Sequence, residues 1–297
     1  MSINAASTGA TANHTPGIGS VGSIADESPS TTVSTFSLLA AALGFLLWGA
    51  GWIVLTQDRY SHLGWILGVV GPILLAIGIM TTISHLARRI GLTAVIAGIL
   101  GSLIAAISTL PYAVSPSNLS KVSGLKFGYG AYGIGLLLGF VCVALVLLHK
   151  EGVMKLGSSI CPPGCPCDNR VHASFATLNA AALGFLLWGI GFIQLMTEPA
   201  GSRMGWVLAT VGSASVAVAI AIHVVHLAMR FGMPAILIGV VSTVVWAFGY
   251  LMNAINPTAG FESTWYSVLF ACYGLGHLLT AVSLLLVVAR ARVRTSA

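Results

Sequence analysis

Charged residues are scarce in this sequence. Only 7% of its 297 residues are Asp, Glu, Lys or Arg, whereas roughly 25% is usual for a soluble domain. A soluble fold of this length needs charge to cover its surface, but helices that face lipid can be apolar all round. With 57% hydrophobic residues, the chain is therefore predicted to lie in a lipid bilayer, as an integral membrane protein.

Acidic residues are absent from the long apolar stretches, because all seven Asp and Glu residues lie outside them. Carriers coupled to protons or cations usually place carboxylates on the transport pathway. General acid–base catalysis often relies on paired carboxylates. The sequence also lacks a nucleophile constellation, a phosphate-binding loop and a dinucleotide fingerprint. We therefore favour a protein without enzymatic activity and without carboxylate-driven ion coupling.

Eight apolar stretches are each long enough for the ~20 residues that cross a bilayer. None contains Asp, Glu, Lys or Arg. The predicted fold class is thus an all-α integral membrane protein with eight transmembrane helices. The expected limits are 36–56, 63–86, 91–113, 127–149, 174–196, 205–228, 233–255 and 265–289.

The 13 basic residues are scattered in the connections between these stretches, which favours a role in topology over nucleic-acid binding. Nine Lys and Arg residues fall on the side of the two termini and four on the opposite side. Basic residues in short loops are retained in the cytoplasm. We therefore expect a multi-pass protein of the cell (cytoplasmic) membrane with both termini in the cytoplasm, and no nucleic-acid partner.

An internal repeat organises the chain. The string AAALGFLLWG occurs at 40–49 and again at 180–189, and further matches follow at an offset of 141 residues, such as Trp65 with Trp206. Because each copy has an even number of spans, the two copies are predicted to be parallel (direct) four-helix repeats. The expected regions are a disordered N-terminal tail (1–34), repeat 1 (35–150), a cytoplasmic Cys- and Pro-rich linker (151–173), repeat 2 (174–290) and a basic C-terminal tail (291–297).

The third span of each copy carries small residues at every fourth position. Such rows allow helix backbones to approach closely in a membrane, so we expect both helices to be buried in their bundles. The matched rows are Ala94, Gly98, Ser102 and Ala106 in the first copy and Ala235, Gly239, Thr243 and Ala247 in the second.

Four histidines are candidates for binding a cofactor. His85 and His226 occupy matched positions, each four residues before an arginine, while His223 and His277 have no histidine counterpart. A structural interpretation places the matched pair at the membrane surface, where they cap helix carbonyls and contact lipid headgroups. In the alternative, His85, His226 and His277 ligate haem, or His223 contributes to a transition-metal site.

The linker sequence CPPGCPC forms a second candidate metal site. It holds Cys161, Cys165 and Cys167, with His172 close behind. Thiolate and imidazole ligands suit zinc and other soft cations. The spacing is not the usual Cys-x2-Cys knuckle, however, and the prolines also fit a stiff linker without a site.

Two functions follow from these observations. The first is transport or permeation of a small, largely uncharged or lipid-like solute, or a role as an accessory subunit beside other membrane subunits. A substrate would then sit at the interface between the repeats. The alternative is a membrane redox or metal-handling protein that binds haem or a transition metal through the histidines and cysteines above.

Overall fold

In the computed structural model, the residues described are 35–157, 175–198, 202–222, 224–257 and 263–295. Helices account for nearly all of them, and this described part contains no β-strand. The all-helical expectation is thereby confirmed.

Eight of the described helices are long and apolar enough to span a membrane, as the sequence predicts. Their bounds are α1 Thr35–Gln57, α2 His62–Met80, α4 Leu92–Val114, α5 Val122–Gly157, α6 Phe175–Thr197, α7 Arg203–Ile222, α9 Met233–Ile255 and α10 Thr264–Thr295.

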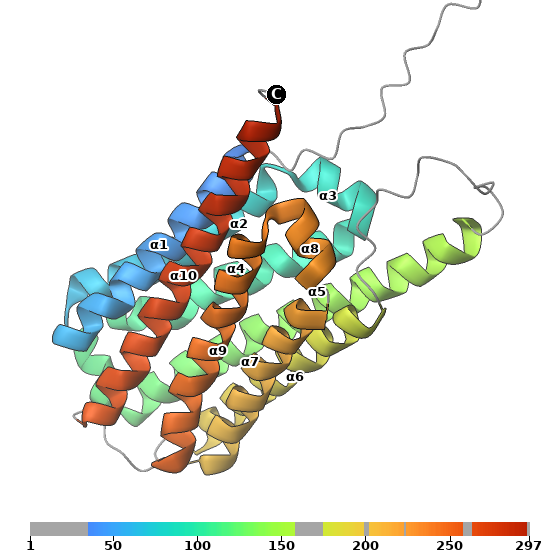
Figure 1. Cartoon of the computed structure of the whole chain (residues 1–297). Coiled ribbons are helices and arrows are strands. Elements are labelled where there is room, and N and C mark those ends of the chain that lie inside the picture. Colours follow the sequence, from blue (N-terminus) through green and yellow to red (C-terminus); the bar gives the residue numbers. More distant parts are fainter. Residues whose placement is uncertain (1–34, 158–174, 199–201, 223, 258–262, 296–297) are drawn as a thin grey trace, which may run out of the picture. The chain divides into compact units, whose positions relative to one another are not determined.

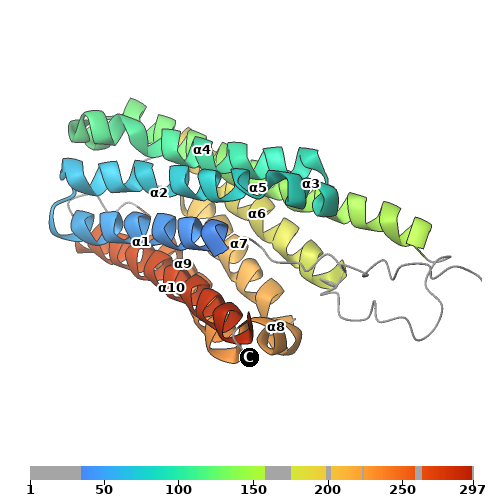
Figure 2. The same cartoon turned by 90° about the horizontal axis from the view of Figure 1, so that it is seen from above.

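The eight long helices form one bundle, seen from two sides in Figures 1 and 2, and their contacts close it into a ring. Each packs closely against two others, in the order α1, α2, α4, α5, α6, α7, α9 and α10, and α10 packs against α1 to close the ring. In this order α1 and α6 lie on opposite sides. The ring therefore has an interior that all eight helices can reach.

Glycines allow the helix backbones to touch at the two places where the half from α1 to α5 meets the half from α6 to α10. At the junction of α1 with α10, a Cβ atom added at Gly49 would lie 2.9 Å from the carbonyl oxygen of Gly274. At the junction of α5 with α6, a Cβ atom at Gly189 would lie 3.1 Å from the carbonyl oxygen of Gly133. Such approaches replace the hydrophobic driving force that lipid cannot supply between helices.

Two short helices interrupt the ring connections and correct the expected span limits. The second span ends at Met80 instead of 86, and α3 (Ile83–Ile90) follows it. Likewise the sixth span ends at Ile222 instead of 228, before α8 (Val224–Phe231). Both short helices are amphipathic, so their polar faces disfavour passage through the hydrocarbon.

Glycines return the chain from each short helix to the next long one. Gly91 has φ +87° between α3 and α4, and Gly232 has φ +97° between α8 and α9. Both values lie where side chains with a Cβ atom are rarely found. The turn therefore explains why these two positions are glycine.

Two long helices extend beyond the expected spans. α5 continues through residues 151–157 of the expected linker, and α10 continues through 291–295 of the expected tail. The rest of the linker, 158–173, lies outside the described residues, as does the N-terminal tail 1–34.

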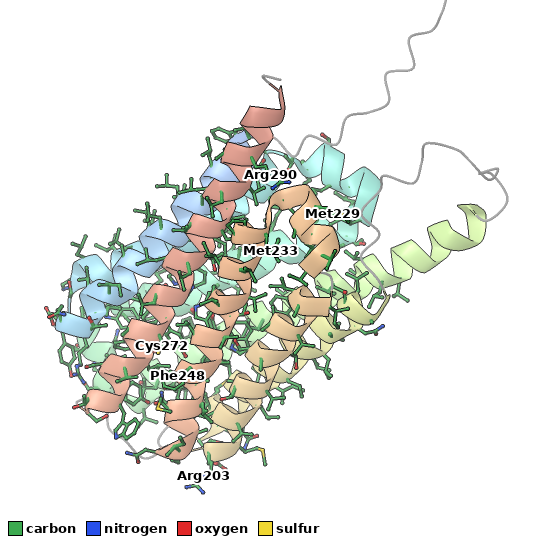
Figure 3. All side chains as sticks on the ribbon, in the orientation of Figure 1. Arg203, Met229, Met233, Phe248, Cys272 and Arg290 are labelled. Atoms are coloured by element: carbon green, nitrogen blue, oxygen red, sulfur yellow. The ribbon has the colours of Figure 1, made fainter. Side chains whose placement is uncertain are left out.

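The bundle has two distinguishable ends (Figure 3). The terminal end holds the start of α1, the end of α10 with Arg290, and α8 with Met229; Arg290 Nη2 donates to the carbonyl oxygen of Met229 at 3.2 Å. The distal end holds the connection from α1 to α2 and the start of α7 at Arg203.

Large aliphatic side chains cover the outside of the ring, among them Leu100, Leu237 and Val244, as expected for a surface in lipid.

Candidate functional site: an aromatic cavity inside the ring

A cavity of about 90 Å³ lies inside the ring, where roughly 10–15 Å³ suffices for one water molecule. Each helix lines it near one end: α1 through Trp48 and Trp52 in its second half, and α2 and α7 through Trp65 and Trp206 in their first turns. Because neighbouring helices run in opposite directions, these positions all fall in the distal half of the bundle. The cavity is therefore confined to that half.

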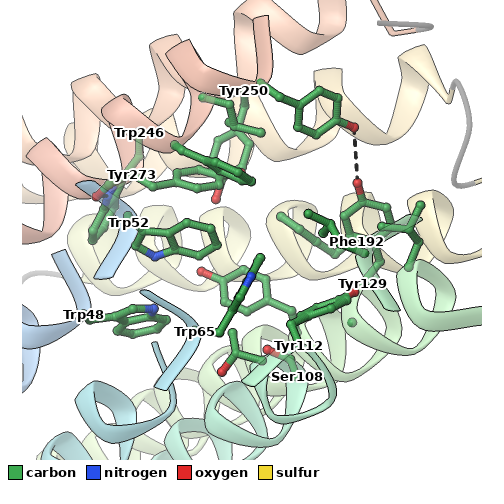
Figure 4. Close-up of a pocket in the computed structure, with 18 of the residues that line it drawn as sticks. Trp48, Trp52, Trp65, Ser108, Tyr112, Tyr129, Phe192, Trp246, Tyr250 and Tyr273 are labelled. Atoms are coloured by element: carbon green, nitrogen blue, oxygen red, sulfur yellow. Dashed lines mark hydrogen bonds between the residues drawn. The ribbon is translucent and has the colours of Figure 1, made fainter. Parts of the chain in front are cut away.

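Aromatic side chains form most of the cavity wall (Figure 4). Six of the seven tryptophans line it, namely Trp48, Trp52, Trp65, Trp188, Trp206 and Trp246. Six of the seven tyrosines do so as well, namely Tyr112, Tyr129, Tyr132, Tyr250, Tyr266 and Tyr273. Tryptophan and tyrosine of membrane proteins usually gather in belts at the lipid–water interface. Here they face inward, so anchoring in the interface does not explain their number.

Ring-to-ring contacts connect the wall from helix to helix. Trp65 of α2 packs on Tyr112 of α4 with ring centroids 4.7 Å apart. Trp206 of α7 stacks on Tyr250 of α9 at 6.2 Å, and Tyr129 of α5 meets Trp206 edge-on at 6.0 Å. Such pairs contribute about 0.5–1.5 kcal/mol each beyond the area they bury. The cavity thus has walls held in place by mutual contact.

The lining is uncharged. Among the described residues that border the cavity, none is Asp, Glu, Lys or Arg. Several hydroxyl groups are occupied by protein acceptors: Tyr112 Oη donates to the carbonyl oxygen of Gly124 at 2.8 Å, and Ser108 Oγ donates to that of Ala105 at 2.6 Å. The hydroxyls of Tyr129 and Tyr266 lie 3.5 Å apart, the dashed pair in Figure 4. A neutral ligand suits this environment, since a desolvated ion would find no counter-charge in the wall.

His277 borders the cavity farther from the distal end than the other α10 residues of the wall. It is only 5% exposed and packs between Trp48 and Trp246, with ring centroids 4.4 Å and 4.9 Å away. Its Nδ1 lies 2.6 Å from the carbonyl oxygen of Tyr273. A carbonyl oxygen only accepts, so Nδ1 carries the proton, and Nε2 is the acceptor nitrogen of the neutral ring.

Indole groups of the wall supply unpaired donors. The Nε1 atoms of Trp48 and Trp52 are buried and have no hydrogen-bond partner. By contrast, Trp65 Nε1 donates to the carbonyl oxygen of Arg59 at 2.9 Å. Leaving a buried donor unpaired costs about 1–3 kcal/mol, and such groups in a native structure often mark the place of a water molecule or ligand.

Of the histidines and cysteines selected from the sequence, the structure places only His277 in a cavity. The backbones of His85 and His226 lie in α3 and α8, but their side chains fall outside the described residues. His223 and the linker residues Cys161, Cys165, Cys167 and His172 also fall outside them. Within the part of the chain that is described, no three His, Cys, Asp or Glu side chains gather as a metal site would require. Haem or metal binding by these residues stays a prediction.

The aromatic lining is what the sequence interpretation missed. A signal was present, because tryptophans recur at matched positions of the two copies: Trp48 with Trp188, and Trp65 with Trp206. Spacing along the sequence does not tell which face of each helix turns inward, so the convergence on one cavity became visible only in the structure.

Comparison of the chain with protein-family models, with curated proteins and with solved structures finds no match.

Proposed function

We propose that this multi-pass protein of the cytoplasmic membrane binds a small, uncharged solute in the aromatic cavity and carries it across the bilayer. The observation behind the proposal is the cavity itself: an uncharged space inside a ring of eight membrane-spanning helices, walled by tryptophan and tyrosine. Buried pockets with aromatic walls and few polar groups are typical of small-molecule sites.

The proposed ring consists of two parallel four-helix repeats, with α1, α2, α4 and α5 corresponding to α6, α7, α9 and α10. Matched close approaches support this arrangement. The pair Gly49–Gly274 joins α1 to α10, and the corresponding pair Gly189–Gly133 joins α6 to α5. The cavity then lies on the axis between the repeats, where substrates of repeat-built carriers bind.

The cavity occupies the distal half only, which favours a carrier over an open pore. In the terminal half, none of the described residues borders the cavity. In the proposed carrier a solute passes this half when the helices repack, as in alternating access. With both termini in the cytoplasm, as the distribution of basic residues favours, the cavity lies in the outer half of the membrane.

Solute counterflow in proteoliposomes tests this function. Vesicles are preloaded with one of several uncharged solutes, and uptake of the same labelled solute is compared with that of empty vesicles. Transport predicts counterflow for at least one neutral solute and its loss when Trp48 and Trp188 are both replaced by alanine. The Trp265→Ala variant is the matched control, because Trp265 is exposed and does not line the cavity. Failure of every neutral solute to exchange would contradict the proposal.

A further inference from the structure

The part of the cavity next to Trp48 and His277 combines an unpaired donor and an acceptor. Trp48 is 7% exposed and its Nε1 has no partner; Figure 4 shows its ring facing the space between the helices. His277, with its ring centroid 4.4 Å from that of Trp48, presents Nε2 as acceptor because Nδ1 is held by the carbonyl oxygen of Tyr273. A ligand group that accepts one hydrogen bond and donates another would pair both.

This corner is not repeated on the other side of the ring. The positions matched to Trp246 and His277 in the first half are Ala105 and Leu136. The added indole of Trp246 lies 4.9 Å from the ring of His277, measured between centroids. Only the second half therefore brings a polar ring and a second aromatic wall to this corner, which gives a ligand one preferred orientation.

We propose that Trp48 and His277 form a subsite for the hydroxyl group of a neutral aromatic alcohol of the phenol class. The hydroxyl oxygen accepts from Trp48 Nε1 and its proton is donated to His277 Nε2, while the aromatic ring packs against Trp246 and neighbouring indoles. The proposal rests on the proposed function, since it names the chemical class of the solute in that cavity.

The subsite fits a phenol better than other neutral aromatics for a physical reason. An ether can accept from Trp48 but cannot donate to His277, and a hydrocarbon can do neither. Buried polar groups left without a partner reject such analogues more strongly than a missing methylene would. Selectivity should therefore follow the hydroxyl group rather than the size of the ring.

The test compares phenol, anisole and toluene, three compounds of similar size, by equilibrium dialysis against the full chain in nanodiscs, with empty nanodiscs correcting for partition into lipid. Phenol should bind roughly tenfold more tightly than anisole, about the effect of one well-placed hydrogen bond, and more tightly still than toluene, which makes neither bond. His277→Leu should abolish the preference for phenol over anisole while retaining toluene binding; leucine is the residue found at the matched position 136. Trp48→Phe, which keeps a ring and removes the donor, should reduce the preference for phenol and anisole over toluene.

Thermal unfolding of both variants establishes that they fold, and Trp265→Phe serves as the indole control outside the cavity. Equal binding of the three compounds to the wild type, or a phenol preference that survives both substitutions, would overturn the subsite while leaving the solute cavity in place. If none of the three binds and no neutral solute exchanges in the counterflow assay, the proposed function fails as well.

Discussion

The half from α1 to α5 and the half from α6 to α10 agree at their two junctions and differ in one corner of the cavity. Glycines that permit close approach recur at matched positions, as in Gly49 and Gly189. In contrast, Ala105 and Leu136 of the first half are replaced by Trp246 and His277 in the second. Close packing thus imposes the same residue on both halves at the junctions, whereas this corner of the cavity is asymmetric.

The largest effect is expected from filling the two junctions. Gly49→Leu and Gly189→Leu each place a side chain against the backbone of the facing helix: the new Cβ would lie 2.9 Å from the carbonyl oxygen of Gly274 at Gly49, and 3.1 Å from that of Gly133 at Gly189. Helices cannot yield at backbone contacts, so we expect a loss of several kcal/mol and failure to assemble. Size-exclusion chromatography and thermal unfolding in detergent measure this.

Gly98→Ala is the control for the junction variants, because its new Cβ would meet only Cys142 Sγ at 3.6 Å, an ordinary contact. Its stability should stay near that of the wild type. If Gly49→Leu were tolerated and Gly189→Leu were not, the two junctions would not be equivalent, and the comparison between the halves would break.

A smaller loss of stability is expected from removing one of the differences between the two halves in the cavity. Trp246→Ala gives the second half the residue of the first, Ala105, and removes ring contacts with His277 and Trp188. Since Trp246 borders open space and is only partly buried, we expect a loss of about 1–3 kcal/mol, below the ~3–5 kcal/mol of a fully packed tryptophan. Unfolding in denaturant measures it. A loss of stability as large as that of a fully packed tryptophan would mean that no open space borders Trp246 in solution.

The smallest effect is expected where the halves differ by one serine side chain. Ser242 Oγ donates to the carbonyl oxygen of Gly276 at 2.8 Å and lies 2.7 Å from Thr280 Oγ1, whereas the first half has Gly101 against Gly135 at the same crossing. Ser242→Gly should therefore destabilise the protein by about 1–2 kcal/mol, since each hydrogen bond contributes about 1 kcal/mol. The same unfolding assay, with Ser215→Gly at a half-buried position of α7 as control, distinguishes this loss from the general cost of glycine in a helix, because Ser215 Oγ donates to the carbonyl oxygen of Val211 in its own helix.

The number of spans was predictable because long runs without charge have few alternatives to a membrane helix. Their ends were less so. The predicted end of the second span at residue 86 extended into α3, because the apolar residues of this amphipathic helix continue the hydrophobic run of the span. The small-residue row was also only partly informative: Ala94 and Ala106 are buried as predicted, but the close crossing of α4 with α5 occurs at Gly101, not at Gly98.

The candidate site was less predictable than the fold. His277 was selected as a ligand for haem or metal, yet its surroundings in the structure are indole and phenyl rings. A search of the sequence for titratable residues finds candidate sites with polar chemistry. The cavity is instead lined by tryptophans and tyrosines, which come together only because the eight helices close into a ring. In the sequence, only the matched tryptophans, Trp48 with Trp188 and Trp65 with Trp206, indicated this aromatic cavity.

Quenching of tryptophan fluorescence tests the central claim most directly. In a Trp265→Phe variant, the six remaining tryptophans all line the cavity, so their emission reports which molecules enter it. A cavity open to neutral solutes predicts that acrylamide, which is uncharged, quenches this emission, while iodide and caesium ions have little effect. Equal protection from all three quenchers, or equal quenching by ions and acrylamide, would contradict the account.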